Sequence, residues 1–164
     1  MFALRGLLYD PKALKIITKD FFLKNRGILF DQIRLAGVES SSIPLLIAFQ
    51  QEAFRYGIQL DIISVRKKPK DSGYLQTIEG KVDLVKPVMY VDDLISPNHK
   101  WVVHSITAIQ KTNIPILNRM YSIVNKSTDK SPTTVVLNNP YEHFSMFDLT
   151  DFKLTHEEYY GTSS

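Results

Sequence analysis

The sequence predicts an α/β fold, in which a mostly parallel central sheet is flanked by helices. Two observations predict it: strand-like and helix-like segments alternate along the chain, and the strand-like segments are apolar and rich in β-branched residues. The length of 164 residues suits one domain with a sizeable core, and 44% apolar and 23% charged residues are ordinary contents for a globular protein.

The first helix follows a strand near Ile33 and is predicted from Ser42 to Tyr56. Apolar residues recur there at the spacing of one helix face. Ser41 or Ser42 can cap this helix, Pro44 suits its first turn, and Gly57 suits its end. The apolar face consists of Leu45, Leu46, Phe49, Ala53 and Phe54.

A second helix, a long loop and four more strands complete the predicted order. The helix is expected at Trp101–Lys111, and the loop, which holds two glycines and a proline, at Lys67–Lys81. The strands are expected at Ile58–Val65, Val85–Val91, Ile114–Val124 and Thr133–Leu137, of which the last ends the sheet. The central strands are those near Ile33, Ile62, Met89 and Ile116.

The whole chain is expected to form a single domain over residues 1–164. Its core is expected at about residues 28–137, preceded by a divergent segment, 1–27, and followed by an acidic, aromatic segment, 138–164. The C-terminal segment is too rich in aromatic residues to resemble a disordered tail. It therefore packs either on its own domain or on a partner.

Charge is distributed unevenly along the chain. The net charge is +3, but the segment 138–164 has five acidic residues and one basic residue, so the rest of the chain is strongly basic. The sharpest basic cluster is Arg66-Lys67-Lys68-Pro69-Lys70. This cluster is either a solvated loop or a site for phosphate, pyrophosphate or another polyanion. Nucleic acid is not an expected partner, because no aromatic residues interleave with the basic ones.

Three loops are expected at the carboxyl edge of the sheet, where open α/β sheets bind ligands. The first, Ala36–Ser42, either seats an anion on its backbone N–H groups or simply begins a serine-capped helix. The second, Tyr90–Ser96, carries Asp92 and Asp93, which can hold ribose hydroxyls, accept a proton, lie near Mg²⁺ or cap the next helix. The third is the basic loop that begins at Arg66.

Taken together, these loops resemble those of the type I phosphoribosyltransferases, and most closely those of the orotate phosphoribosyltransferases. Phe30–Leu45 resembles the family's first strand and pyrophosphate loop. Arg66–Gly73, with Ile78–Gly80 after it, resembles the mobile catalytic loop, and Val91–Ile95 resembles the start of the loop that binds phosphoribosyl pyrophosphate. The resemblance covers roughly residues 28–125 and implies a type I phosphoribosyltransferase-like sheet.

The resemblance also implies a reaction. In the family, Mg²⁺-bound phosphoribosyl pyrophosphate loses pyrophosphate as a nitrogen base attacks the anomeric carbon, and catalysis is mainly charge stabilisation and positioning. By matching position, the implied catalytic residues are Arg66, Lys67 and Lys70, which would meet pyrophosphate, and Asp93. The implied ligand-binding residues are Asp92 and Asp93 at the ribose, Ser40, Ser41 and Ser42 in the pyrophosphate loop, and Ser96 in the phosphate loop.

Departures from the family pattern predict weak or lost transferase activity. After the acidic pair, Pro97 removes a backbone donor, and no glycine allows a close approach to the 5′-phosphate. Ser41 and Ser42 stand where glycine, or a basic residue followed by glycine, is usual. Ser72 stands where orotate enzymes carry a catalytic-loop histidine.

Three functions stay open at this point. The chain is an active phosphoribosyltransferase in which Ser96 replaces a threonine hydroxyl and His99 supplies charge, a module that binds a phosphosugar or nucleotide without chemistry, or a scaffold reused in an assembly. The expected partners are phosphoribosyl pyrophosphate or a nucleotide-like anion, and a second copy or an assembly partner at the C-terminal segment. The aromatic residues of that segment are Phe144, Phe147, Phe152, Tyr159 and Tyr160.

Several other classes are excluded or not expected. The absence of cysteine excludes a disulfide framework, a cysteine nucleophile and thiolate metal sites. The four histidines lack the HExxH spacing of metalloproteases, and no G-x-S-x-G elbow is present. No metal site made by the protein alone is expected, and Mg²⁺ only with an active enzyme. With no membrane-length apolar run and no signal peptide, we expect a cytoplasmic protein that does not bind membranes.

Overall fold

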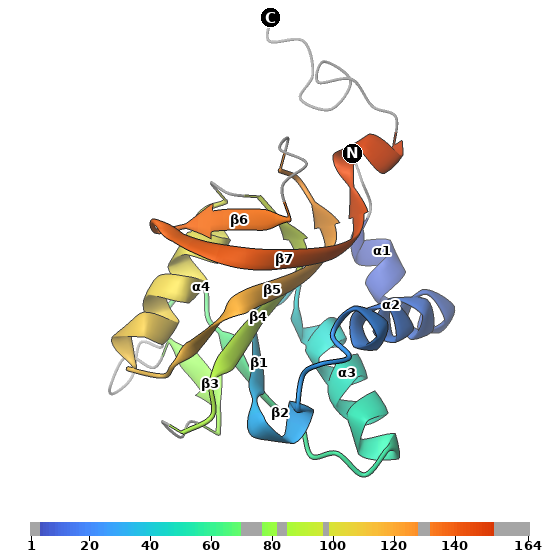
Figure 1. Cartoon of the computed structure of the whole chain (residues 1–164), viewed down its shortest axis with the longest axis horizontal. Coiled ribbons are helices and arrows are strands. Elements are labelled where there is room, and N and C mark those ends of the chain that lie inside the picture. Colours follow the sequence, from blue (N-terminus) through green and yellow to red (C-terminus); the bar gives the residue numbers. More distant parts are fainter. Residues whose placement is uncertain (1–3, 70–76, 82–84, 97–98, 128–131, 153–164) are drawn as a thin grey trace, which may run out of the picture.

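A computed structural model describes residues 4–69, 77–81, 85–96, 99–127 and 132–152. Seven strands form one sheet in the order β3-β2-β1-β4-β5-β7-β6 (Figure 1). The pairs β2–β1, β1–β4, β4–β5 and β5–β7 are parallel, and only the edge strands β3 and β6 pair antiparallel. The predicted mostly parallel α/β sheet is confirmed. The strands are β1 Arg34–Val38, β2 Asp61–Val65, β3 Ile78–Gly80, β4 Val88–Ile95, β5 Ile116–Asn125, β6 Thr133–Val136 and β7 Asn139–Asp148.

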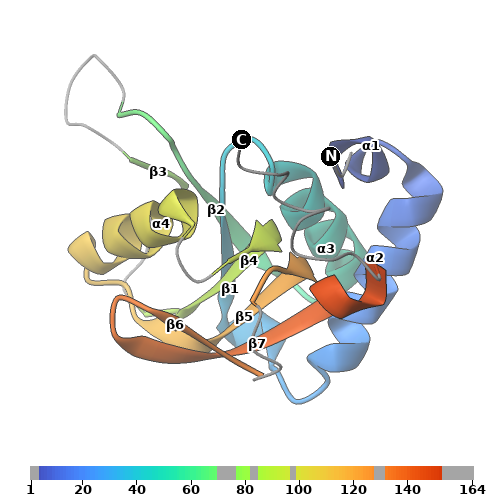
Figure 2. The same ribbon diagram turned by 90° about the horizontal axis from the view of Figure 1, so that it is seen from above.

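Helices cover both faces of the sheet. One face carries α4, and the other carries α1, α2 and α3, as the view from above shows (Figure 2). The α-helices are α1 Leu4–Leu8, α2 Pro11–Lys24, α3 Ile43–Arg55 and α4 Lys100–Lys111, and short 3₁₀ helices lie at Phe30–Gln32 and Leu149–Phe152. No helix in these parts of the chain has the length and hydropathy needed to cross a membrane.

The core on the α2 and α3 side is built on stacked aromatic rings. The ring of Phe21 in α2 lies parallel to that of Phe49 in α3, with centroids 4.0 Å apart. Tyr121 of β5 meets Phe21 edge-on, and its hydroxyl donates a hydrogen bond of 2.7 Å to Asp20. The N-terminal segment is therefore part of the core, although the sequence prediction placed it outside.

The predictions of α3 and α4 are confirmed to within one or two residues at each end. The first runs over Ile43–Arg55, with Pro44 in its first turn, and Gly57 follows it with a φ of +76°. Ser42 occupies the N-cap position, but its side chain makes no capping hydrogen bond, so the predicted capping role is wrong. The second begins at Lys100, one residue before its predicted start.

Three strand predictions are corrected. The stretch Tyr90–Ile95 is not a loop, because β4 continues through the acidic pair. The predicted long loop contains β3, which pairs with the end of β2. The strand at Thr133–Val136 is not the last, because a turn at Leu137 and Asn138, both with positive φ, leads into β7, which carries the sheet past residue 137. Such a two-residue turn needs positive φ at both positions. Leucine rarely adopts positive φ, so the residue types did not predict a turn here.

The described part of the acidic C-terminal segment packs on its own chain. Phe144, Phe147 and Phe152 contact the core beneath α2 and α3. Tyr159 and Tyr160 lie outside the described residues, so a partner at this segment stays a prediction.

Candidate active site

The three predicted segments meet at the carboxyl ends of β1, β2 and β4. Hydrogen bonds join them: the backbone N–H of Glu39 donates to Val65 at the end of β2, and the N–H of Lys67 donates to the Glu39 carboxylate at 3.0 Å. Ser42 reaches across to Asp92 of β4 at 2.9 Å. Segments far apart in the sequence thus form one edge, as the parallel sheet predicts.

The serine loop, Glu39–Ser42, connects β1 to α3. Its first peptide bond, Glu39–Ser40, is cis. Ser40 is exposed, Ser41 is half-buried, and Ser42 is fully buried. The loop therefore presents Ser40 toward solvent, while the hydroxyls of Ser41 and Ser42 point inward to Asp92.

The two acidic residues of β4 have different environments. Asp92 is only 2% exposed, and its carboxyl accepts hydrogen bonds from Ser41, Ser42 and Tyr90 and from the N–H of Asp93. Burial, and then the neighbouring Asp93 carboxylate, raise the pKa of Asp92 to about 8. Asp93 is half-buried. The donors around Asp92 come from its own chain, and Asp93 is the more exposed member of the pair.

The basic loop begins as a fixed extension of β2. The Arg66 guanidinium forms an ion pair with Glu79 of β3, and the Arg66 carbonyl accepts a hydrogen bond of 2.8 Å from Nε2 of His104. Pairing with a buried carboxylate would make Arg66 a structural residue and not a pyrophosphate ligand. Glu79 is about half exposed, so this pair leaves the pyrophosphate interpretation open. Lys70 and Ser72 lie outside the described residues.

Cations gather where α4 begins. The ammonium groups of Lys67 and Lys100 lie 4.8 and 4.7 Å from the centre of the Trp101 ring. His99 precedes the helix, and its pKa is lowered first by burial and then by the nearby Lys126. Sequence reasoning identified Lys67 and His99 but missed Lys100, Trp101 and Lys126. The signal for Lys126 was its position directly after β5, at the same edge of the sheet.

Ser96 is half-buried between the end of β4 and α4, and its carbonyl accepts a hydrogen bond of 3.1 Å from the N–H of His99. Pro97 and Asn98, on which the predicted weakening of the phosphate loop depends, lie outside the described residues.

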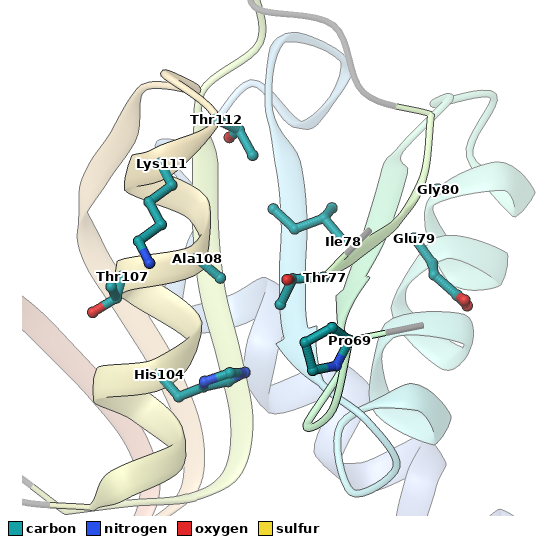
Figure 3. Close-up of a pocket in the computed structure, with 10 residues that line it drawn as sticks. All are labelled: Pro69, Thr77, Ile78, Glu79, Gly80, His104, Thr107, Ala108, Lys111 and Thr112. Carbon is teal, nitrogen blue, oxygen red and sulfur yellow. The ribbon is translucent and has the colours of Figure 1, made fainter. Parts of the chain in front are cut away.

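A cavity of about 960 Å³ lies beside this site, between α4 and β3. Figure 3 shows its two walls, with Lys111 and His104 on α4 and Ile78 on β3. Pro69 of the basic loop borders it, whereas the serine loop and the acidic pair do not. The cavity is therefore adjacent to the predicted site and not the place where its three loops meet.

Comparisons with known proteins fit this geometry. No known protein-family profile matches the sequence. The chain is 36% identical over 92 residues to the orotate phosphoribosyltransferase of Thermococcus kodakarensis, covering 55% of this chain and 46% of the relative. It is 27% identical over 117 residues to that of Methanocaldococcus jannaschii, covering 71% and 61%. The chain spans about half the length of the curated relatives that it matches.

Solved structures share the fold at lower identity. A phosphoribosyltransferase from Corynebacterium diphtheriae superposes with a TM-score of 0.74 at 17% identity, covering 94% of this chain and 85% of the other. The orotate phosphoribosyltransferase of Mycobacterium tuberculosis in complex with phosphoribosyl pyrophosphate gives 0.68 at 17% identity, covering 94% and 84%. The chain is therefore a phosphoribosyltransferase-like protein, with the type I phosphoribosyltransferase fold and a sequence similar to those of orotate phosphoribosyltransferases.

Proposed function

We propose that the chain binds phosphoribosyl pyrophosphate, or a related phosphosugar or nucleotide, at this edge of the sheet and has weak or lost transferase activity. The observation that carries the proposal is the gathering of Lys67, Lys100 and Lys126 at the start of α4, close to His99 and Asp93. Cationic side chains beside a helix N-terminus attract phosphate groups strongly.

The proposed roles follow from position. Arg66 and Lys67, with Lys70, neutralise pyrophosphate, and the serine loop holds it with the Ser40 hydroxyl and with backbone N–H groups. Asp93 accepts hydrogen bonds from the ribose hydroxyls, and Ser96 lies toward the 5′-phosphate. Asp92 and the hydroxyls of Ser41 and Ser42 are not assigned a ligand contact, because both hydroxyls donate to Asp92.

Mg²⁺ fits this site as part of the ligand. Within the described ranges, no three His, Asp or Glu side chains gather as metal ligands. Mg²⁺ keeps several waters and is commonly held by one or two carboxylates and the substrate phosphates. Asp93 is the carboxylate available for that purpose.

Weak transfer is proposed because the phosphate loop differs from the family pattern. Each charge-assisted hydrogen bond is worth roughly 1.5–3 kcal/mol, so losing two donors costs ~3–6 kcal/mol in binding the sugar and its transition state. An assembly of several copies and a cytoplasmic location also belong to this proposal.

Isothermal titration calorimetry with phosphoribosyl pyrophosphate and Mg²⁺, and with pyrophosphate alone, tests the proposal. We expect both ligands to bind the wild type, and Lys67→Met to weaken each about tenfold, the loss of one charge-assisted contact. The matched control is Lys86→Met, because Lys86 pairs with Asp61 at the amino end of β2, the opposite edge of the sheet. It is expected to bind like the wild type.

Ligand binding by the wild type and a turnover assay with Asp93→Asn separate the two alternative functions. If the wild type binds neither ligand, the proposal fails and the scaffold alternative is favoured. If the wild type turns over orotate and Asp93→Asn abolishes turnover, the chain is an active phosphoribosyltransferase with an altered phosphate loop.

A further inference from the structure

Asp92 is surrounded by donors from its own chain. One carboxyl oxygen, Oδ1, accepts hydrogen bonds from Ser42 at 2.9 Å, from Ser41 at 3.2 Å and from the N–H of Asp93 at 2.9 Å. The other oxygen, Oδ2, accepts one from the Tyr90 hydroxyl at 2.8 Å. The carboxyl is therefore fully engaged within the protein, at a position where the family resemblance implies a ribose contact.

Gly37 gives Ser42 the space to make this contact. A Cβ added at Gly37 would stand 2.3 Å from Cβ and 2.7 Å from Oγ of Ser42, and 2.7 Å from the carbonyl oxygen of Val91. Ser42 thus fits against the bare backbone of β1, and its hydroxyl bonds Asp92 instead of capping α3. β1, the serine loop and β4 therefore come together at the Asp92 carboxyl.

We propose that Asp92 is a positioning residue: it holds the serine loop in the shape that receives the anion and itself contacts no ligand. This inference rests on the proposed function, in which the serine loop holds pyrophosphate. Asp92 accepts hydrogen bonds from two hydroxyls of the serine loop, those of Ser41 and Ser42. Removing the Asp92 carboxyl would therefore disturb the loop and, through it, anion binding.

Asparagine is the conservative replacement at this position. Its amide oxygen can accept hydrogen bonds in the place of Oδ1, and its amide nitrogen can donate to the Tyr90 oxygen. The charged and titratable groups that face Asp92 are Asp93 and Tyr90. An amide of nearly the same shape can therefore keep most of the contacts of Asp92.

The experiment compares pyrophosphate, which has no ribose, with phosphoribosyl pyrophosphate. We expect Asp92→Ala to weaken pyrophosphate alone about tenfold, equivalent to ~1.4 kcal/mol, and Asp92→Asn to restore binding to within about threefold of the wild type. Lys86→Met, at the opposite edge of the sheet, is the control and is expected to bind both ligands like the wild type. If Asp92→Asn leaves pyrophosphate unchanged but loses phosphoribosyl pyrophosphate, Asp92 is a ribose ligand and the inference is overturned.

Two further measurements keep the test decisive. Should Asp92→Ala not fold, Ser42→Ala removes the Ser42–Asp92 hydrogen bond from the other side. It is expected to weaken pyrophosphate binding by the same factor. Hydrogen exchange at the amides of Ser40–Ser42 needs no ligand, and we expect it to be faster in Ser42→Ala than in Asp93→Asn. If the wild type binds no pyrophosphate, the proposed function fails, while unchanged exchange in Ser42→Ala would independently reject the positioning role.

Discussion

Ser42 lies so close to Gly37 that a single methyl group on Gly37 would stand 2.3 Å from the Ser42 Cβ. Because the Val91 carbonyl is also only 2.7 Å away, the strand backbone cannot simply shift to make room. We expect Gly37→Ala to lower the free energy of unfolding by about 1–3 kcal/mol, the usual cost of overpacking, and to weaken pyrophosphate binding. Urea denaturation and calorimetry measure the two effects. Gly27→Ala, where a Cβ meets nothing within 4 Å, is expected to change neither.

Arg66 forms an ion pair with Glu79, and under the proposed function Glu79 would compete with pyrophosphate for the Arg66 guanidinium. Exposed ion pairs contribute only ~0–1 kcal/mol, so exchanging Glu79 for pyrophosphate costs little. We expect Glu79→Gln to tighten pyrophosphate binding about two- to fivefold, because Arg66 loses its competing partner. Glu52→Gln, which breaks the exposed pair with Arg55 on α3, serves as the control in the same titration. Equal or weaker binding by Glu79→Gln would show that Arg66 does not meet the anion.

Phe21 is completely buried between Phe49 and Tyr121, although it lies in the N-terminal segment. We expect Phe21→Ala to lower the free energy of unfolding by about 3–5 kcal/mol, as for other buried phenylalanines. Leu23→Ala, on the same helix but 47% exposed, is expected to cost less than about 1 kcal/mol. Urea denaturation followed by the fluorescence of Trp101 compares them. Similar losses in the two variants would mean that α2 does not share the core.

The parts of the fold that were predicted from the sequence are those whose signals are local. In α3, apolar spacing, Pro44 and Gly57 all agree on one helix, and the structure has it at Ile43–Arg55. The strand β7 has no such local signal, because its place is set by pairing with β5, more than 20 residues earlier in the chain. The polar end of β4 was missed for a similar reason. Adjacent aspartates are typical of loops, and the serine hydroxyls that make a buried Asp92 possible come from a distant segment.

The candidate site was predicted in outline but not in its details. The order of the three loops located the carboxyl edge of the sheet, since parallel strands bring their loops together there. The different environments of Asp92 and Asp93 could not be predicted, because they depend on Ser42, which lies 50 residues away in the sequence. Lys126 was likewise missed, since only the folded chain brings it to His99. Lys100 adjoins His99 and Trp101 in the sequence, but its place over the Trp101 ring depends on the fold of the chain.

A buried histidine makes the protein sensitive to acid. His143 of β7 is bonded to Ser122 at 2.7 Å and to Thr134 at 2.8 Å, and burial lowers its pKa from 6.5 to about 4. The neutral imidazole stabilises the fold fully above pH 6.5, and this contribution is lost as the pH falls through 4. We expect a loss of about 2–3 kcal/mol over that range, measured by urea denaturation.

Two observations check this histidine directly. In an NMR titration, the imidazole resonances of His143 should not move between pH 8 and 5, as its lowered pKa requires. Thr134→Val leaves the imidazole buried and is expected to retain the acid loss, whereas His143→Gln should remove it. An imidazole that titrates at its ordinary pKa would contradict the prediction.

Asp92 has the opposite effect on stability, at higher pH. Its pKa is raised from 3.8 to about 8, so the folded chain keeps a proton that the unfolded chain has already released. Stability from this group is therefore full below pH 3.8 and is lost progressively until the pH passes 8. Asparagine cannot titrate, so between these limits we expect the wild type to lose up to about 1.4 kcal/mol per pH unit relative to Asp92→Asn.

Urea denaturation of both proteins at several pH values measures this difference, and the contribution of His143 cancels because both proteins contain it. Asp93→Asn removes one cause of the raised pKa of Asp92, so the decline should end at a lower pH than in the wild type. A constant difference between wild type and Asp92→Asn from pH 4 to 8 would mean that Asp92 is ionised in the folded protein. In that case a charged carboxylate, and not its neutral form, holds the serine loop.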